Sequence, residues 1–156
     1  MRIKIMQILS LVLLLILVGC HTQPTSLVEE SEYEANIFNI IEDKELSIEM
    51  NGLVNKNKNQ VILEIKNLGT IPIGFGEYYQ IEKHQGEAWY RVPFVENIAF
   101  VDIGYLIDPG KTEKMIISLK DLKHALTEGE YRIIKEFWTE EGIPYSLAYE
   151  FTIGQE

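Results

Sequence analysis

Histidine and carboxylate side chains are the first candidates for chemistry in this sequence, because they supply most metal ligands and general acid–base groups. The three histidines, His21, His84 and His124, lie far apart along the chain. Glu82 and His84 are two residues apart and would share one face of a strand, which is the spacing of a weak metal pair. A solvated hairpin edge explains this pair better, since no HExxH or paired CxxC motif accompanies it. The sequence therefore predicts no metal site.

Nucleophilic catalysis and cofactor binding also lack their usual motifs. The sequence has no GxSxG elbow, no phosphate loop of the GxxxxGK type around Gly74, and no DxDxDG calcium loop. Asp102, Asp108 and Asp121 are well separated and are typical of turns or helix caps. We therefore expect a protein that is not an enzyme and that holds no cofactor.

The single cysteine, Cys20, indicates a different chemistry. Arg2 and Lys4 precede a short apolar run that ends in Leu17-Val18-Gly19-Cys20, which is the pattern of a signal peptide. The run is shorter than the about 20 residues that a spanning helix needs. The last four residues resemble a bacterial lipobox. That resemblance implies that residues 1–19 are removed and that Cys20 carries palmitate-type lipid, which would anchor the chain to the outer face of the plasma membrane.

Charge and composition exclude other classes. The 156 residues carry a formal net charge of -10, whereas a nucleic-acid binder needs a basic face. Residues 20–43 contain several close glutamates and predict an acidic, solvated tether. The apolar stretch 37–41 interrupts that tether, and we expect it to be a short ordered segment, either an edge strand or a short helix.

Residues 44–156 show the period-two alternation of half-buried strands. Residues 51–59 are rich in turn formers, Asp108-Pro109-Gly110 and Glu140-Glu141-Gly142 predict further turns, and residues 120–126 have the spacing of a short helix. About seven short strands in this length predict an all-β immunoglobulin-like sandwich of antiparallel strands, with the helix before strand F. The alternating stretches lie near residues 46–50, 61–66, 79–83, 89–92, 115–119, 130–138 and 147–153.

One tyrosine in this pattern has a predicted structural role. Tyr131 follows Thr127-Glu128-Gly129-Glu130 at the start of the sixth of these strands. This arrangement resembles the tyrosine corner, in which the hydroxyl bonds to backbone just upstream. Since one cysteine cannot form an intramolecular disulfide, packing and such hydrogen bonds must hold the two sheets together.

Motifs spread over residues 46–153 resemble a known family, the bacterial Ig-like domains found in lipoproteins of Gram-positive, Bacillus-type bacteria. The resemblance implies an Ig-like fold on a secreted, membrane-tethered protein, and it implies no reaction. The matching stretches are Gly76-Glu77-Tyr78-Tyr79, Ile81-Glu82-Lys83, Trp89-Tyr90-Arg91-Val92-Pro93, 99–105, Pro109-Gly110 and 129–137.

Aromatic side chains are the main candidates for binding. Core packing accounts for part of any alternating set, and the remainder could form an amphipathic patch for a protein or glycan. The candidates in this patch are Tyr78, Tyr79, Trp89, Tyr90 and Tyr105.

We therefore predict a non-catalytic binding or scaffolding module at the cell envelope, with an unidentified envelope protein or glycan as its partner. Two alternatives stay open at this point. One is a protease inhibitor built on a similar sandwich, which rests on fold analogy alone. The other is a cell-wall enzyme, which would need paired carboxylates or an activated nucleophile in one cleft.

Overall fold

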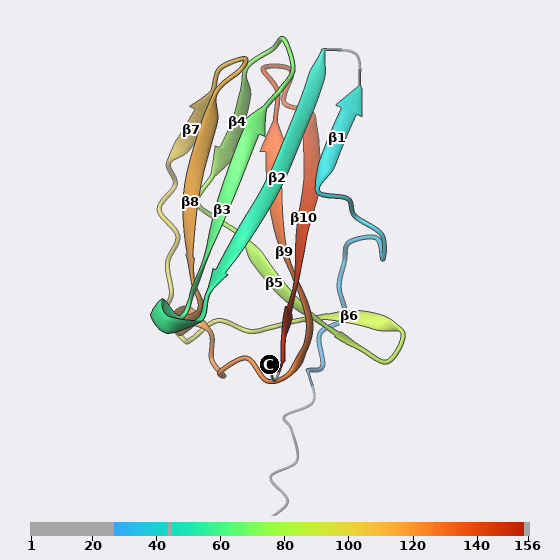
Figure 1. Ribbon diagram of the computed structural model, residues 1–156, viewed down its shortest axis with the longest axis vertical. Helices are drawn as coiled ribbons and strands as arrows, with labels where there is room; N and C mark the ends of the chain where they lie inside the picture. The colour runs from blue at the N-terminus through green and yellow to red at the C-terminus, as the bar shows by residue number, and fades with distance from the viewer. Residues whose placement is uncertain (1–26, 44, 155–156) are drawn as a thin grey trace, which may run out of the picture.

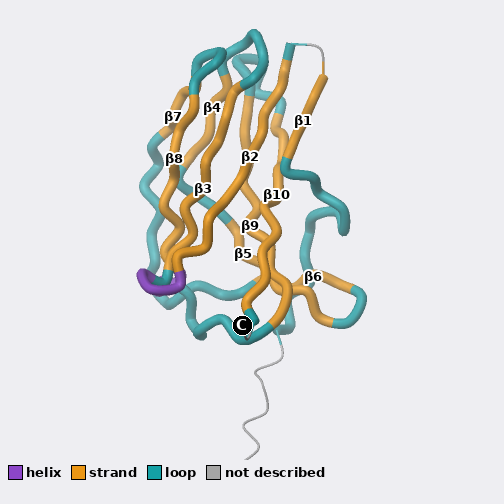
Figure 2. Tube along the Cα trace, in the orientation of Figure 1, coloured by secondary structure: helices purple, strands orange, loops and turns teal. Residues whose placement is uncertain are grey.

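The computed structural model describes residues 27–43 and 45–154, and these form an antiparallel β-sandwich of two packed sheets (Figures 1 and 2). Over the described residues the only helices are two 3₁₀ turns, η1 (Lys56–Lys58) and η2 (Leu119–Asp121), and no helix there is long and apolar enough to cross a membrane. The strands are β1 (Ile40–Asp43), β2 (Leu46–Asn55), β3 (Gln60–Asn67), β4 (Ile73–Gly76), β5 (Gln80–Gln85), β6 (Ala88–Arg91), β7 (Gly104–Ile107), β8 (Thr112–Ser118), β9 (Gly129–Trp138) and β10 (Pro144–Ile153).

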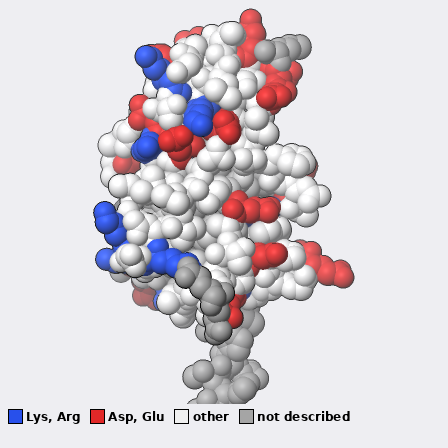
Figure 3. Space-filling model, viewed as in Figure 1, with Lys and Arg blue, Asp and Glu red and all other residues white. Residues whose placement is uncertain are grey.

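The first sheet has the order β1-β2-β3-β8. Its inner side chains alternate with mostly charged and polar ones that face solvent, apart from an apolar row of Leu53, Ile62 and Ile116, and this is the pattern of a sheet with one buried face. On the solvent face, Lys66 lies 3.4 Å from Glu64, and Lys114 lies 3.3 Å from the same carboxylate. Figure 3 shows this face, with charged side chains towards both ends and a mostly uncharged band between them.

The second sheet has the order β6-β5-β9-β4-β7, with β10 on the other side of β9. Both β4 and β5 pair with β9, Gly74 opposite Trp138 and residues 80–83 opposite 131–134. The strands β4 and β5 therefore lie one after the other along β9, and residues 77–79 separate them. The ammonium of Lys135 fills this interruption and donates to the carbonyl oxygens of Gly76 and Tyr78.

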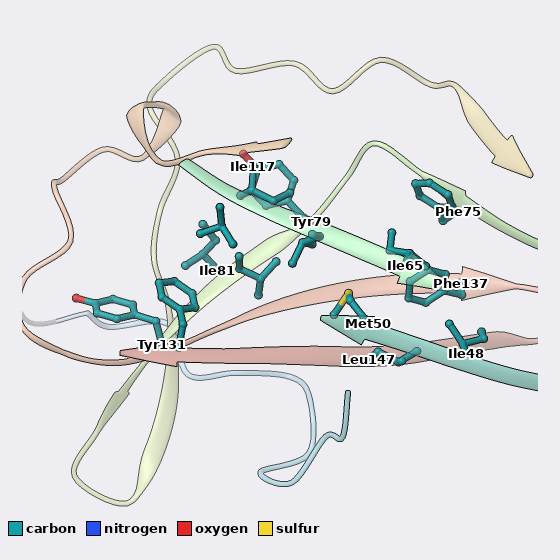
Figure 4. Close-up of a cluster of buried hydrophobic side chains, with 14 of the residues drawn as sticks. Ile48, Met50, Ile65, Phe75, Tyr79, Ile81, Ile117, Tyr131, Phe137 and Leu147 are labelled. Carbon is teal, nitrogen blue, oxygen red and sulfur yellow. The ribbon is translucent and has the colours of Figure 1, made fainter. Parts of the chain in front are cut away.

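The core lies between the sheets and is built from alternating apolar residues of both (Figure 4). Ile48, Met50 and Ile65 enter it from the first sheet, and Phe137 and Leu147 enter it from the second. Each such buried side chain contributes about 1.5–3 kcal/mol, so the core supplies the main stabilisation in a domain without a disulfide.

The hydroxyl of Tyr131 donates to the carbonyl oxygen of Thr127 at 2.7 Å. This is the hydrogen bond of a tyrosine corner. It joins the start of β9 to the loop before it, and the ring itself is buried beside Phe151.

Three details differ from the sequence prediction. The described residues contain more strands than the seven expected, because β4 and β7 lack an alternating pattern and β1 lies within the predicted tether. The strand β2 continues through Gly52 to Asn55, so the predicted turn at residues 51–59 is confined to its second half. The predicted helix at 120–126 is only the single turn η2.

Gly52 explains the second difference. A Cβ atom at this position would lie 2.3 Å from the ring of Tyr149 on the opposite sheet. The glycine therefore makes room for an aromatic ring, and it does not mark a turn. The turn falls at Asn59, which has a positive φ of 53°.

Residues 27–39, which we call the N-terminal segment, lie against the domain along their length, whereas the sequence predicted a solvated tether there. Backbone hydrogen bonds join Ser31 to Trp89 of β6, Ala148 of β10 to Phe38, and Met50 of β2 to Asn39. The segment thus crosses the outer face of the second sheet before it enters β1, which overlaps the expected ordered segment 37–41 only at Ile40 and Ile41. The signal peptide and Cys20 lie outside the described residues.

Candidate interaction surface

The structure divides the predicted aromatic patch into two separate groups. Tyr78, Tyr79 and Tyr105 lie near β4 and β7, whereas Trp89 and Tyr90 belong to β6 at the other edge of the same sheet. Tyr78 and Tyr105 are exposed, Tyr90 is half-buried, and Tyr79 and Trp89 are buried. The five residues therefore do not form one surface.

Trp89 packs on the side of the molecule that the N-terminal segment covers. The guanidinium of Arg132 lies over the Trp89 ring, 4.5 Å from its centroid. The His84 ring also packs against Trp89, with 4.9 Å between the two ring centroids. Glu82 and His84 do not act together, because Glu82 bonds Arg132 whereas His84 Nδ1 lies 3.5 Å from Glu130. Over the described range no group of three potential metal-ligating side chains occurs.

The ion pair between Glu82 and Arg132 has no exposed surface on either side chain. Arg132 Nε donates to Glu82 Oε2 at 2.7 Å, and its Nη1 donates to the carbonyl oxygens of Glu34 and Ala35 at 3.0 Å. Both carbonyls belong to the N-terminal segment. The segment is therefore the cover that takes this pair out of solvent and completes its hydrogen bonding.

Arg91 extends this network towards solvent. Its guanidinium donates to the Gln80 side chain and to Glu29 at 2.8 Å, and it lies 3.3 Å from Glu32. On the same face the Tyr33 hydroxyl donates to Glu136 at 3.1 Å, and burial raises the pKa of Tyr33 well above its usual value. Two glutamates of the predicted tether, Glu29 and Glu32, thus bond to a cation of the domain, and a tether hydroxyl, that of Tyr33, bonds to a carboxylate of the domain.

The other side of the sandwich holds a groove of about 530 Å³, which lies within the range of ligand sites. We call it the edge groove. One wall is β8 and the other is the segment 98–105, which leads into β7; Phe75 and Tyr79 lie between these walls. Figure 1 shows β7 and β8 on the same side of the molecule, one from each sheet.

The wall formed by β8 is the edge of the strand. Four consecutive residues, 113–116, line the groove, although side chains on a strand alternate between two faces. A surface that touches all four must therefore include the backbone edge. Within the described ranges, the strand pairs only with β3, so this edge carries backbone N–H and C=O groups that have no strand partner.

Aromatic rings form the lining between the walls. Tyr79 packs edge-to-face against Phe94 and Phe100 at centroid distances of 5.4 and 5.3 Å, and Phe75 stacks on Tyr105 at 5.2 Å. The Tyr79 hydroxyl donates to the Ser118 carbonyl oxygen at 3.4 Å, and burial raises the pKa of Tyr79 to about 12. The aromatic lining is thus apolar and uncharged at neutral pH.

The rim of the groove is acidic. Glu77 accepts from the Tyr105 hydroxyl at 2.9 Å, and this hydrogen bond raises the pKa of Tyr105. Lys114 bonds Glu64 on the outer face of the sheet. Glu113 and Asp121 line the groove without an ion-pair partner among the described residues. The groove therefore combines an apolar lining, a free strand edge and an excess of negative charge.

A further exposed aromatic residue, Trp138, was missed by the sequence prediction. Its ring lies on Gly74, where a Cβ atom would be 2.2 Å from the indole nitrogen. Trp138 is paired with Pro144 of β10 on one side and with Gly74 of β4 on the other. Gly74 is paired in turn with Leu106 of β7. The signal was the pair of glycines at 74 and 76, which have no turn role in β4 and make room for the ring.

The fold thus defines an immunoglobulin-like β-sandwich with a covered side and an open side. Residues 42–152 match the bacterial Ig-like domain family, and the chain belongs to that family. Among curated protein sequences, none matches this chain.

Two solved structures are similar to this chain at low TM-scores. One is the archaellum periplasmic stator protein FlaG from Sulfolobus acidocaldarius, at 19% identity and a TM-score of 0.40, with 67% of this chain and 99% of that chain covered. The other is the complex of FlaF and FlaG from the same organism, at 15% identity and a TM-score of 0.38, with 83% and 100% covered.

Proposed function

We propose that this chain is a non-catalytic binding or scaffolding module, held at the outer face of the plasma membrane by lipid on Cys20. The observation that carries the binding role is the edge groove, with its apolar aromatic lining and acidic rim on a rigid sandwich. Membership of a bacterial Ig-like family supports the same role.

The buried ionisable groups favour a structural role over a catalytic one. Glu82 is committed to Arg132, and Lys135 is committed to two backbone carbonyls. In the part of the chain that the structure describes, every buried side-chain nitrogen and oxygen has a hydrogen-bond partner. No buried acid or base in that part is left to act on a substrate.

The anchoring part of the proposal rests on the lipobox-like sequence that ends at Cys20. Two or more acyl chains would hold the protein stably, whereas a single chain gives only reversible binding. The substitution Cys20→Ser removes the attachment atom and leaves the described domain unchanged.

Cell fractionation and labelling with radioactive palmitate test this part directly. We expect label in the full chain, and for Cys20→Ser we expect loss of both the label and membrane retention. Retention of the variant at the wild-type level would contradict the anchor. Circular dichroism of both proteins serves as the control for folding.

A further inference from the structure

We infer that the edge groove binds an extended, basic peptide segment of a partner protein, which adds to the first sheet as a strand beside β8. This inference rests on the proposed binding function and specifies the chemistry of its partner. Strand addition uses backbone hydrogen bonds for affinity and side-chain pockets for selectivity.

The first argument is the state of β8 itself. It has seven residues, and its outer edge is one wall of the groove. Every second residue of an edge strand turns its N–H and C=O outward, where a neighbouring strand can pair with them at about 4.8 Å. The facing wall, residues 98–100, makes no backbone hydrogen bond to β8 in the described structure.

The second argument comes from another edge of the same molecule. At β6 the backbone of Arg91 donates to Glu29 at 2.8 Å, and Ser31 donates to Trp89 at 2.8 Å, with Glu30 paired to Tyr90. The chain thus adds its own extended segment to that edge. Likewise β1 covers the edge of β2. The edge of β8 presents the same backbone groups without such a cover.

The side chains around β8 specify what the added strand carries. Its inward residues would contact Phe75, Tyr79 and Phe100, which suit aromatic or β-branched side chains. Its outward residues would lie beside Ile116, the end of a cross-strand row on the solvent face in which Ile116 and Leu53 are exposed and Ile62 is half-buried. The added strand is therefore apolar on both faces near its centre.

The charges specify the remaining positions. Glu113 and Asp121 lie on the rim without a cationic partner among the described residues. Lysine or arginine in the peptide would supply that charge, and the overall net charge of -10 would attract a basic segment from a distance. A glycan offers neither the regular backbone donors nor the cations, so a peptide fits these observations better.

The test uses a randomised decapeptide library, panned against the full chain extracted in mild detergent. We expect enrichment of peptides that carry aromatic or β-branched residues at adjacent central positions and lysine or arginine towards their ends. The variant Glu113→Lys should weaken the selected peptides about tenfold. The matched control Glu87→Lys makes the same charge change at the exposed tip of the β5–β6 hairpin, and it should leave affinity unchanged.

Hydrogen exchange on the bound complex reports strand addition itself. The outward-facing amides of Thr112, Lys114, Ile116 and Ser118 should become at least about tenfold more protected when a selected peptide binds, and N-methylation of alternate peptide residues should abolish binding. A photo-crosslinking residue at position 116 should capture the peptide. At position 53, with a similar exposure of 66% against 63%, it should not.

Several results would overturn the inference. These are no enrichment, selection of acidic peptides, equal binding by Glu113→Lys, or binding without protection of β8. A stable dimer of the chain that protects β8 would assign the groove to a second copy and would also overturn it. If the wild-type chain is anchored through Cys20 and any of these results is obtained, strand addition alone is refuted. If the wild-type chain selects the expected peptides but carries no palmitate label, the anchor alone is refuted.

Discussion

The two sides of this sandwich differ in how the edges of their sheets are covered. On the covered side, the N-terminal segment bonds to the edge of β6 and buries the ion pair between Glu82 and Arg132. On the open side, β8 keeps its outer backbone edge free beside a lining of aromatic rings. Free edges are usually protected against unwanted pairing, by charges among other means. This difference between an edge covered by the chain itself and an edge left open beside aromatic rings supports the proposed binding of a partner at the open side.

The largest expected effect comes from breaking the buried ion pair on the covered side. Arg132→Met leaves the Glu82 carboxylate buried without its cation, which should cost about 3–5 kcal/mol of the unfolding free energy. Urea denaturation measures this. The double variant Glu82→Leu, Arg132→Met removes both charges and should recover part of the loss. A single variant that loses less than about 1 kcal/mol would contradict the importance of the pair.

The next effect concerns Lys135, which pins the interruption between β4 and β5. Burial lowers its pKa from 10.5 to about 8, although Glu136 and Glu77 partly oppose this by attracting the charge. Below pH 8 the ammonium is charged in both the folded and unfolded states, so its burial cost is fully present.

Between pH 8 and 10 the unfolded chain keeps a proton that the folded chain releases. The contribution of Lys135 to the unfolding free energy should therefore rise with pH, by about 2 kcal/mol over this range, whereas tyrosines with a raised pKa, such as Tyr79, act in the opposite direction near pH 10 in both proteins. The variant Lys135→Met should lack this rise, which denaturation at several pH values will show. Parallel pH profiles for the two proteins would disprove the pKa shift.

A smaller effect is expected at the end of the covered side. Tyr131→Phe removes the hydrogen bond to the Thr127 carbonyl and keeps the ring in the core, so it should cost about 0.5–1.5 kcal/mol. Differential scanning calorimetry measures the change. An unchanged melting curve would mean that packing alone holds this corner.

The smallest effect sharpens the comparison from the open side. Ile116→Thr keeps a β-branched residue at an exposed position on β8, so the unfolding free energy should change by less than about 0.5 kcal/mol. The same denaturation assay applies. A loss above about 1 kcal/mol would show that Ile116 stabilises the fold, against the idea that this edge is held for a partner.

Much of the sandwich followed from alternation in the sequence. Residues such as Ile48 and Met50 alternate with polar neighbours, and the turns around Pro109-Gly110 and Glu141-Gly142 carry strong turn residues. The family assignment rests on the same stretches and agrees with the match over residues 42–152.

The parts that could not be predicted depend on contacts between distant segments. Glu29 and Glu32 resemble a solvated linker until Arg91 is placed beside them. Gly74 and Gly76 give no strand signal, because their role is to accept the ring of Trp138. The aromatic candidates were the right residue types, but only Tyr79 and Tyr105 of the five line the edge groove, because β6 carries Trp89 and Tyr90 to the opposite edge.

The fixed N-terminal segment has a consequence for how the domain would stand on a bilayer. Leu27 already packs against the core, and Figure 1 shows that the described chain begins at the end that also holds the C-terminus. Seven peptide units separate Leu27 from Cys20, and a chain of this length spans at most about 25 Å. A lipid on that cysteine would keep the module close to the headgroups, with the turns at 68–72 and 139–143 directed towards the cell wall.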